Sequence, residues 1–484
     1  MKFQTAEFNK IQADTAICFI YEDYKKSEFF EYLNELSNNE LDNQINFGVF
    51  GGKYLETLKI AINNSLKVVL TGLGKYEELT RKKYSIAIAE AARTAKKIAN
   101  GNIIAAELTE GREFSKAQSA KILLSALSIG LYKYDKYTED KNKIDTIEIV
   151  ENNIASDIEE NLVEGIEISN AMNFAKDLVN EPAQNATPQY ISEIAKQIAL
   201  ENNLEIKVFN KEQCKQMGMN AFLAVGQGSI NEPKFIHLIY RPNCAPRKKI
   251  ALVGKGITFD AGGMNIKPAS SMLTMKDDMT GAASVLGIIQ AISKIKPDIE
   301  LHVVSALCEN MTSGKAYKQG DILTAMNGKT IEVDNTDAEG RITLADALTY
   351  CDNLGVDEVI DIATLTGAVI VSLGHNITGV LGNNQEQIDK FIKISKDSCE
   401  NTWQMPILDE LKDNLKSEIA DMKNTGGRNA GTSTAGWFLS NFTKSNKWMH
   451  LDIAGTAYLD KSNKETLFGP TGVMIRSLIN YLLA

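Results

Sequence analysis

Histidine is scarce in this sequence. The four histidines of the 484-residue chain lie far apart, and none belongs to an HExxH or H-x-H pair. Zinc chemistry based on histidine ligands is therefore unsupported. No serine lies in a GxSxG turn, so a Ser-His-Asp triad is unsupported as well. His302 and His450 alternate with apolar residues, and we expect both to be hydrogen-bonded core residues.

Paired cysteines, long apolar runs and a leader segment are also missing. The six cysteines form no CxxC pair, and their scatter fits a reducing compartment. Cys308 and Cys351 lie in apolar or helical stretches and are expected in the core. No apolar run reaches membrane-spanning length, and the segment MKFQTAEFNK lacks the apolar region of a signal peptide. We expect a cytoplasmic protein that does not bind membranes.

Positive charge is in deficit, and proline is absent from the first third of the chain. The net charge of −10 does not favour a broad nucleic-acid-binding surface. All nine prolines lie between Pro182 and Pro470, which predicts a domain boundary before Pro182. With 44% apolar and 24% charged residues, the chain has the composition of a soluble globular protein of two or three domains.

Short apolar runs alternate with amphipathic ones in the N-terminal part, which predicts a small α/β domain. The expected strands are 15–20, 67–70 and 102–108, and the expected helices are 77–99 and 116–131. A charged stretch from about 132 to 160 contains one strand, expected to be exposed, around 144–150. The predicted domains are 1–150 and 164–484, joined by a connector at 151–163. Gly72-Leu73-Gly74 is expected to form a tight turn, because a lone GxG is weak support for a phosphate site.

The C-terminal part repeats the alternation over a greater length and predicts a mixed, largely parallel central sheet. Its expected strands are 205–209, 235–240, 249–253, 301–306, 330–333, 358–363 and 448–453, and its expected helices are 164–180, 281–295, 344–354 and 435–442. Thr187 is expected to cap a further helix that begins at Pro188. Ligands of such sheets bind at the carboxyl ends of the strands. Lys255, Asp260 and Thr364 should follow strand ends and converge there.

Two glycine-rich segments carry the residues with chemical potential. The segment 253–283 reads VGKGITFDAGGMNIKPASSMLTMKDDMTGAA, and 335–348 reads NTDAEGRITLADAL. Four carboxylates would repel one another in a shared site unless cations neutralise them: Asp260, Asp278, Asp337 and Glu339. Two divalent ions would balance them, and oxygen ligands accept Mg²⁺, Mn²⁺, Co²⁺ or Zn²⁺. Asp337 and Glu339 are two residues apart, so in extended backbone both side chains would point the same way.

Basic residues in the same segments suggest separate roles. Lys255 can bind a metal only as the neutral amine, whereas a charged lysine could polarise a carbonyl group. Arg341 suits forked binding of a small oxyanion. A surface ion pair is the simpler interpretation of each residue alone, but it does not explain the whole set.

These segments resemble the signature segments of the leucyl aminopeptidase family, the two-metal cytosolic aminopeptidases. DLVNEPAQNATP, AVGQGS, DIATLTGA and HLDIAGTAY resemble that family too, so the resemblance covers roughly Glu164 to the end. It extends more weakly to the N-terminal domain, whose fold in this family resembles macro domains. Ala261, Met264-Asn265 and Thr280 depart from the commoner family residues, but no ligand position is lost.

The resemblance implies a role for each site residue. Asp260 and Glu339 would bridge two metal ions, Asp337 would bind one of them, and Lys255 and Asp278 would bind the other. Lys267 would stabilise the oxyanion, and Arg341 would hold a bicarbonate that acts as general base. Met275, Thr364 and Gly367 would line the pocket for the first side chain of the peptide. The implied activity is release of N-terminal Leu and other medium apolar residues by an enzyme that carries Mn²⁺ or Zn²⁺ and assembles as a homohexamer.

Two other functions stay open at this point. The carboxylate set would also serve a two-metal phosphoesterase, although only Lys267 and Arg341 are at hand to hold a phosphate. The N-terminal domain could instead bind a nucleotide or ADP-ribose, for which the Gly72-Leu73-Gly74 segment is the only support.

Overall fold

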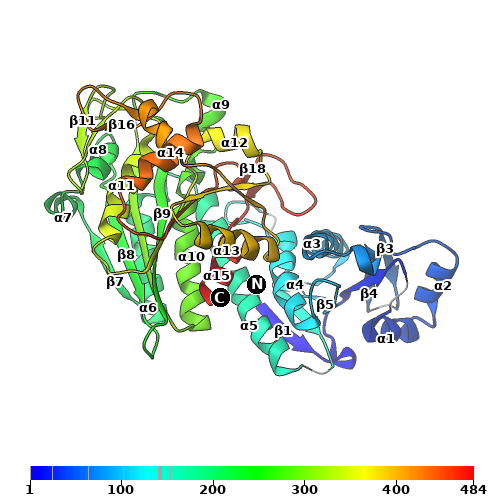
Figure 1. The fold of residues 1–484 in the computed structure, drawn as a ribbon. Coiled ribbons are helices and arrows are strands. Elements are labelled where there is room, and N and C mark those ends of the chain that lie inside the picture. The colour runs from blue at the N-terminus through cyan, green and yellow to red at the C-terminus, as the bar shows by residue number, and fades with distance from the viewer. Residues whose placement is uncertain (1, 24–25, 64, 102, 140–143, 153) are drawn as a thin grey trace. The chain divides into compact units, whose positions relative to one another are not determined.

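The computed structural model describes residues 2–23, 26–63, 65–101, 103–139, 144–152 and 154–484, and the chain divides into two compact units (Figure 1). The first unit comprises Met1–Asn173, Asp397–Cys399 and Asp460–Phe468. The second comprises Phe174–Lys396, Glu400–Leu459 and Gly469–Ala484. Helix α5, Ser156–Asn180, contributes to both units. The sequence-based domain limits at 150 and 164 stay a prediction.

The first unit is built on a six-stranded sheet in the order β1-β6-β5-β2-β4-β3. Its strands are β1 Lys2–Ala6, β2 Thr15–Tyr21, β3 Thr57–Ala61, β4 Lys67–Gly74, β5 Ile103–Glu107 and β6 Thr146–Val150. All neighbours are parallel except β3, which pairs antiparallel with β4 at the edge. The helices are α1 Glu28–Leu36, α2 Glu40–Asn46, α3 Arg81–Ile98 and α4 Lys116–Leu131.

Side chains along β2 alternate between two apolar cores, because successive residues of a strand point to opposite faces. Ile17 and Phe19 join the cluster that contains buried residues of α3 and α4. Cys18 and Ile20 join the cluster that contains buried residues of α1 and α2. Helices therefore cover both faces of this sheet, as a parallel sheet requires.

The expected turn at Gly72-Leu73-Gly74 is wrong, because β4 continues through Gly74. A Cβ atom on Gly72 would lie 2.0 Å from the carbonyl oxygen of Lys53 and 2.6 Å from the carbonyl carbon of Gly52. The glycine thus allows another stretch of backbone to cross the strand closely. Gly72 therefore has a packing role. Because the segment forms no turn, the only support for a phosphate site there is lost.

The strand expected to be exposed near 144–150 is buried. β6 lies between β1 and β5, and Ile147 and Ile149 are covered. The carboxylate of its one charged residue, Glu148, accepts hydrogen bonds from the backbone N–H groups of Gln12 and Ala13 at 2.9 and 3.0 Å. The charged flanks of the segment suggested an exposed strand, but β1, more than 130 residues earlier in the chain, pairs with β6 and covers that edge.

The second unit is built on an eight-stranded mixed sheet in the order β15-β14-β17-β13-β9-β10-β8-β7. Its strands are β7 Glu205–Phe209, β8 Lys234–Tyr240, β9 Lys248–Asp260, β10 Ile299–Asn310, β13 Glu358–Ala363, β14 Thr378–Gly382, β15 Thr402–Gln404 and β17 Trp448–Asp452. The four central strands β17, β13, β9 and β10 run parallel. Smaller pairings join β11 Ile322–Thr324, β12 Thr330–Glu332 and β16 Met422–Lys423, and also β18 Tyr458–Leu459 and β19 Gly469–Pro470.

Helices of the second unit cover the large sheet (Figure 1). Buried residues of α8, α11 and α14 share one core cluster with residues of the central strands, such as Val253 and Val304. The helices are α6 Pro188–Asn202, α7 Lys211–Gln216, α8 Asn220–Gly226, α9 Ala269–Met272, α10 Thr280–Ile295, α11 Glu339–Cys351, α12 Gly367–Leu373, α13 Gln385–Asp397, α14 Gly431–Ser440 and α15 Ile475–Leu483. The predicted cap of α6 is confirmed, since the Thr187 side chain accepts from the N–H of Tyr190. In the part of the chain that is described, none of the helices has the length and apolar composition of a membrane span.

Two elements of the second unit differ from expectation in ways that matter for the site. β9 extends to Asp260, so Lys255 and Asp260 lie within the strand and not after it. Gly254 lets the backbone at Gly281 pack closely on this strand, because a Cβ there would lie 2.5 Å from the carbonyl oxygen of Gly281. α11 begins at Glu339, so Asp337 and Glu339 do not share an extended backbone.

The predicted core roles of two histidines are confirmed. His302 contacts His237 and Glu300, each at 2.9 Å. His450 is fully buried and contacts Asp361 at 2.5 Å. Cys308 and Cys351 are buried, as expected.

Candidate metal centre

The predicted metal ligands come together at the carboxyl end of the central sheet of the second unit. Lys255 and Asp260 lie on β9, and Asp278 lies in the short 3-10 helix Met275–Met279. Glu339 is the first residue of α11, and Asp337 precedes it by two positions. Three separate stretches of chain therefore contribute to one cluster, at the edge of the sheet where the sequence predicted that the ligands would converge.

One half of the cluster surrounds Lys267. Its ammonium nitrogen lies 2.8 Å from Asp260 Oδ2 and 2.6 Å from Asp337 Oδ1. One carboxylate oxygen each from Asp260, Asp337 and Glu339 lie within 4.8 Å of one another, which is close enough to share an ion.

The other half surrounds Lys255. Its ammonium nitrogen lies 2.6 Å from Asp278 Oδ1 and 3.0 Å from Glu339 Oε1, and it donates to the carbonyl oxygen of Thr364 at 2.9 Å. The hydroxyl of Thr364 also donates to Asp278 Oδ1, at 2.7 Å. Glu339 connects the two halves, because it belongs to both groups.

Burial and close charges shift the pKa values of the residues in this cluster. Burial raises the pKa of Asp278, and burial together with the Glu339 carboxylate raises the pKa of Asp260. Burial acts to lower the pKa of Lys255, but the carboxylates of Asp278 and Glu339 outweigh it and raise that pKa. The same balance raises the pKa of Lys267. Because two ammonium groups face four carboxylates, added positive charge would stabilise the ionised cluster.

The residues present fit a divalent cation. Asp278 Oδ2 and Glu339 Oε2 are buried oxygens that accept no hydrogen bond from the described residues. Unpaired buried oxygens are costly, and hard carboxylate oxygens are the ligands that divalent cations accept. The ligand set by itself does not choose among Mg²⁺, Mn²⁺, Co²⁺ and Zn²⁺.

Asn310 is a site residue that the sequence interpretation missed. It ends β10 directly opposite Asp260, is fully buried, and donates from Nδ2 to Asp260 Oδ1 at 2.7 Å. The same amide donates to the carbonyl oxygen of Thr336 at 3.0 Å. Asn310 thus ties the end of β9 to the segment before Asp337. Its place four residues after the strand predicted at 301–306 was the one signal that could have identified it.

Arg341 lies in the first turn of α11, buried from solvent. Its Nη1 donates to the carbonyl oxygen of Asn424 at 3.0 Å, while Nε has no hydrogen-bond partner in the part of the chain that is described. Burial lowers the pKa of Arg341 to about 10, so it remains charged at neutral pH. Within the described residues it forms no ion pair, which leaves its charge available to an anion.

The three predicted pocket residues lie beside the cluster along the chain. Met275 begins the 3-10 helix that carries Asp278, and it is partly exposed. Thr364 follows β13 and contacts Asp278 directly. Gly367 begins α12 and is exposed, with no atom within 4 Å of the position of a Cβ.

Two models of one protein family match this chain. The model described as "Cytosol aminopeptidase family, catalytic domain" matches residues 173–479, and the one described as "Cytosol aminopeptidase family, N-terminal domain" matches residues 17–141. A probable cytosol aminopeptidase of Nostoc punctiforme is 44% identical over 439 residues, which cover 90% of this chain and 89% of that protein. One of Persephonella marina is 38% identical over 493 residues, covering 100% and 99%.

Solved structures agree with the sequence comparison. A mutant tomato leucine aminopeptidase superposes with a TM-score of 0.87 at 33% identity, covering 100% of this chain and 96% of that one. The bottromycin maturation enzyme BotP in complex with Mn superposes with a TM-score of 0.86 at 28% identity, covering 97% and 99%.

The two-domain α/β fold and the carboxylate–lysine cluster, together with these matches, define a metal-dependent aminopeptidase, a hydrolase that acts on peptides. More particularly, the chain belongs to the cytosol aminopeptidase family, and the family resemblance seen in its sequence is confirmed. The phosphoesterase alternative is thereby set aside.

Proposed function

We propose that this enzyme releases N-terminal leucine and other medium apolar residues from peptides, using a water molecule activated by two divalent ions. The observation that carries the proposal is the convergence of all five predicted ligands and Lys267 in one buried cluster. A cluster that served only as a structural ion-pair network would not need oxygens buried without donors.

Each ligand has a proposed place. Asp260 and Glu339 would contact both ions, Asp337 would bind one, and Lys255 with Asp278 would bind the other. Two such ions lower the pKa of a bound water and polarise the scissile carbonyl group. Mn²⁺ and Zn²⁺ are the metals we favour, with Mg²⁺ and Co²⁺ as alternatives.

The remaining residues would act on the substrate. Lys267 is held by Asp260 and Asp337 at the edge of the cluster, and its charge would stabilise the oxyanion of the tetrahedral intermediate. Arg341 would hold a bicarbonate ion as the general base, a role that its buried charge and unpaired Nε support. Met275, Thr364 and Gly367 would line the pocket for the first side chain of the peptide.

Removal and return of metal test the proposal. Enzyme stripped with chelator should hydrolyse leucine p-nitroanilide at less than about 1% of the loaded rate, because the cluster then lacks its activating ions. Titration with Mn²⁺ or Zn²⁺ should restore the rate. N-acetyl-leucine p-nitroanilide is the control and should stay uncleaved, since its acylated nitrogen is a poor ligand. Cleavage of the acetylated substrate, or a rate indifferent to metal, would contradict the proposal.

The position of Asn310 leads to a second expected outcome. Asn310→Ala should weaken metal binding or activity by about 10- to 100-fold, because groups that orient metal ligands have effects of that size. Metal titration of the stripped variant, read by return of activity, measures the loss. Asn327→Ala is a matched control, because that exposed amide lies outside the cluster, where it donates to the carbonyl oxygen of Asn441 and accepts from the N–H of Lys329. Unchanged metal dependence in Asn310→Ala would show that Asp260 needs no such support.

Assembly and location are proposed from the family resemblance alone. We propose a cytoplasmic homohexamer, for which sedimentation analysis at micromolar concentration is the direct measurement; a monomer there would exclude it.

A further inference from the structure

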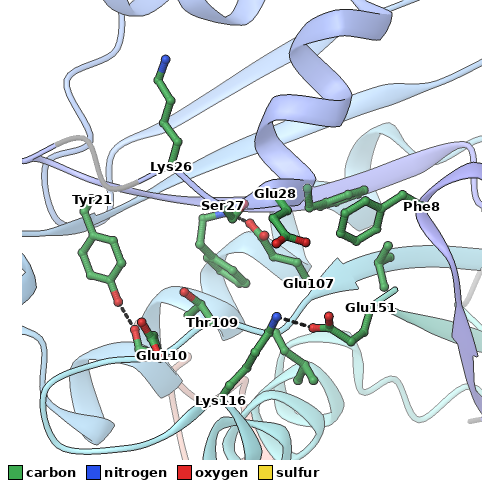
Figure 2. A pocket seen from close by; sticks show the side chains of 14 residues that line it. Phe8, Tyr21, Lys26, Ser27, Glu28, Glu107, Thr109, Glu110, Lys116 and Glu151 are labelled. Carbon is green, nitrogen blue, oxygen red and sulfur yellow. Dashed lines mark hydrogen bonds and ion pairs between the residues drawn. The ribbon is translucent and has the colours of Figure 1, made fainter. Parts of the chain in front are cut away.

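The first unit contains a cavity of about 230 Å³ at the carboxyl ends of β2, β5 and β6 (Figure 2). β2 and β5 are neighbours in the sheet. From β2 the chain continues to β4 on one side, and through α3 it returns to β5 on the other side. Open α/β sheets bind their ligands at such a switch point, beyond the carboxyl ends of the strands. Nothing in the catalytic proposal uses this cavity.

A buried carboxylate faces the cavity. Glu107 ends β5, is only 2% exposed, and accepts a hydrogen bond from the N–H of Phe19 at 2.7 Å. Burial raises the pKa of Glu107, although hydrogen bonds from Ser27, Phe19 and Cys18 and the charge of Lys116 oppose that rise. In the described part of the chain no lysine or arginine forms an ion pair with Glu107. A buried carboxylate without an ion pair would be stabilised by a bound cation.

The two lysines described at the cavity are already neutralised. Lys116 lies 2.5 Å from Glu151, and Lys26 lies 2.7 Å from Asp42, which does not line the cavity. Figure 2 shows the Lys26 side chain extending away from Glu107. The wall therefore carries an excess of negative charge, which disfavours a phosphate or ADP-ribose.

Aromatic rings complete the wall. The rings of Phe8 and Phe29 have centroids 5.3 Å apart, and Phe19 and Tyr21 also line the cavity. The faces of such rings attract organic cations and provide apolar contact for the body of a ligand. Carboxylates combined with aromatic faces are the chemistry that recognises an organic ammonium group.

We propose that this cavity binds a small primary amine with an apolar or aromatic body. The ammonium group lies against Glu107, and the body packs against Phe8 and Phe29. This site is separate from the metal centre and does not rest on the proposed peptide specificity.

Calorimetric titration of the metal-loaded, full-length protein tests the site with benzylamine. Benzyl alcohol has the same body without the charge and should bind at least about tenfold more weakly, as should benzylamine with Glu107→Gln. Glutamine keeps the oxygen that accepts from Phe19, so that variant should fold. Phe8→Leu keeps an apolar side chain without the ring and should weaken binding by about threefold.

Controls separate this site from the catalytic one. Glu35→Gln changes an exposed glutamate of the same unit outside the cavity and should leave binding unchanged. Leucine p-nitroanilide hydrolysis should be normal in Glu107→Gln and Phe8→Leu. The proposal is overturned if benzylamine gives no heat, or if benzyl alcohol binds equally well. It is also overturned if both cavity variants bind benzylamine like the parent, or if ADP-ribose binds and Phe8→Leu weakens that binding.

Discussion

Glu339→Gln is expected to lower kcat/KM for leucine p-nitroanilide by more than about 10³-fold. Glu339 is 1% exposed, belongs to both halves of the cluster, and has one buried oxygen without a donor. Glutamine has nearly the same shape, but it removes one negative charge and directs an amide donor toward the cations. The measurement is kcat/KM together with the metal content of the purified variant.

A nearby glutamate provides the control for this substitution. Glu332 ends β12 and accepts a hydrogen bond from the Ser417 hydroxyl at 2.5 Å, outside the cluster. Glu332→Gln should retain full metal content and near-parental kcat/KM. If Glu339→Gln kept its metal and more than a tenth of the activity, Glu339 could not be a shared ligand.

Lys267→Ala should lower kcat by about 10²- to 10³-fold with little change in KM, because the lost charge would act on the transition state. Its metal affinity should not fall, since the variant removes a cation that competes for the carboxylates of Asp260 and Asp337. Steady-state kinetics and a metal titration measure the two effects separately.

A purely structural role for Lys267 predicts a different effect of the substitution. If the lysine only held the two carboxylates in place, the variant would lose metal affinity, and excess metal would restore kcat. Lys318→Ala removes an exposed lysine that pairs with Asp321 at 3.6 Å and should match the parent. Near-full turnover by Lys267→Ala would exclude the proposed oxyanion role.

Helices and strands with a clear apolar period were predictable in detail. The helix expected at 116–131 and the strands at 205–209 and 358–363 have the same limits in the structure. In these segments local propensity and burial agree, because each packs one regular face or is buried throughout.

Prediction failed where a distant part of the chain changed the meaning of a local pattern. Gly72 was predicted to lie in a turn because the local sequence does not show that the backbone of Lys53 packs against it. β6 looked exposed because its partner β1 lies far from it in the sequence, at Lys2–Ala6. The orientation of Glu339 was misjudged because α11 begins there, where the preceding residue Ala338 leaves the extended conformation.

The kind of reaction could be predicted from the types of residue in the sequence alone. Two glycine-rich segments rich in carboxylates, with lysines at set positions and no histidine motif, indicated metal-dependent hydrolysis and the aminopeptidase family. Only the folded chain decided which groups meet: Lys255 with Asp278 and Glu339, and Lys267 with Asp260 and Asp337. It alone brought Asn310 onto Asp260 and opened the cavity at Glu107. Residue identity sets what a side chain can do, whereas distance and burial depend on how strands remote in the chain align in the sheet.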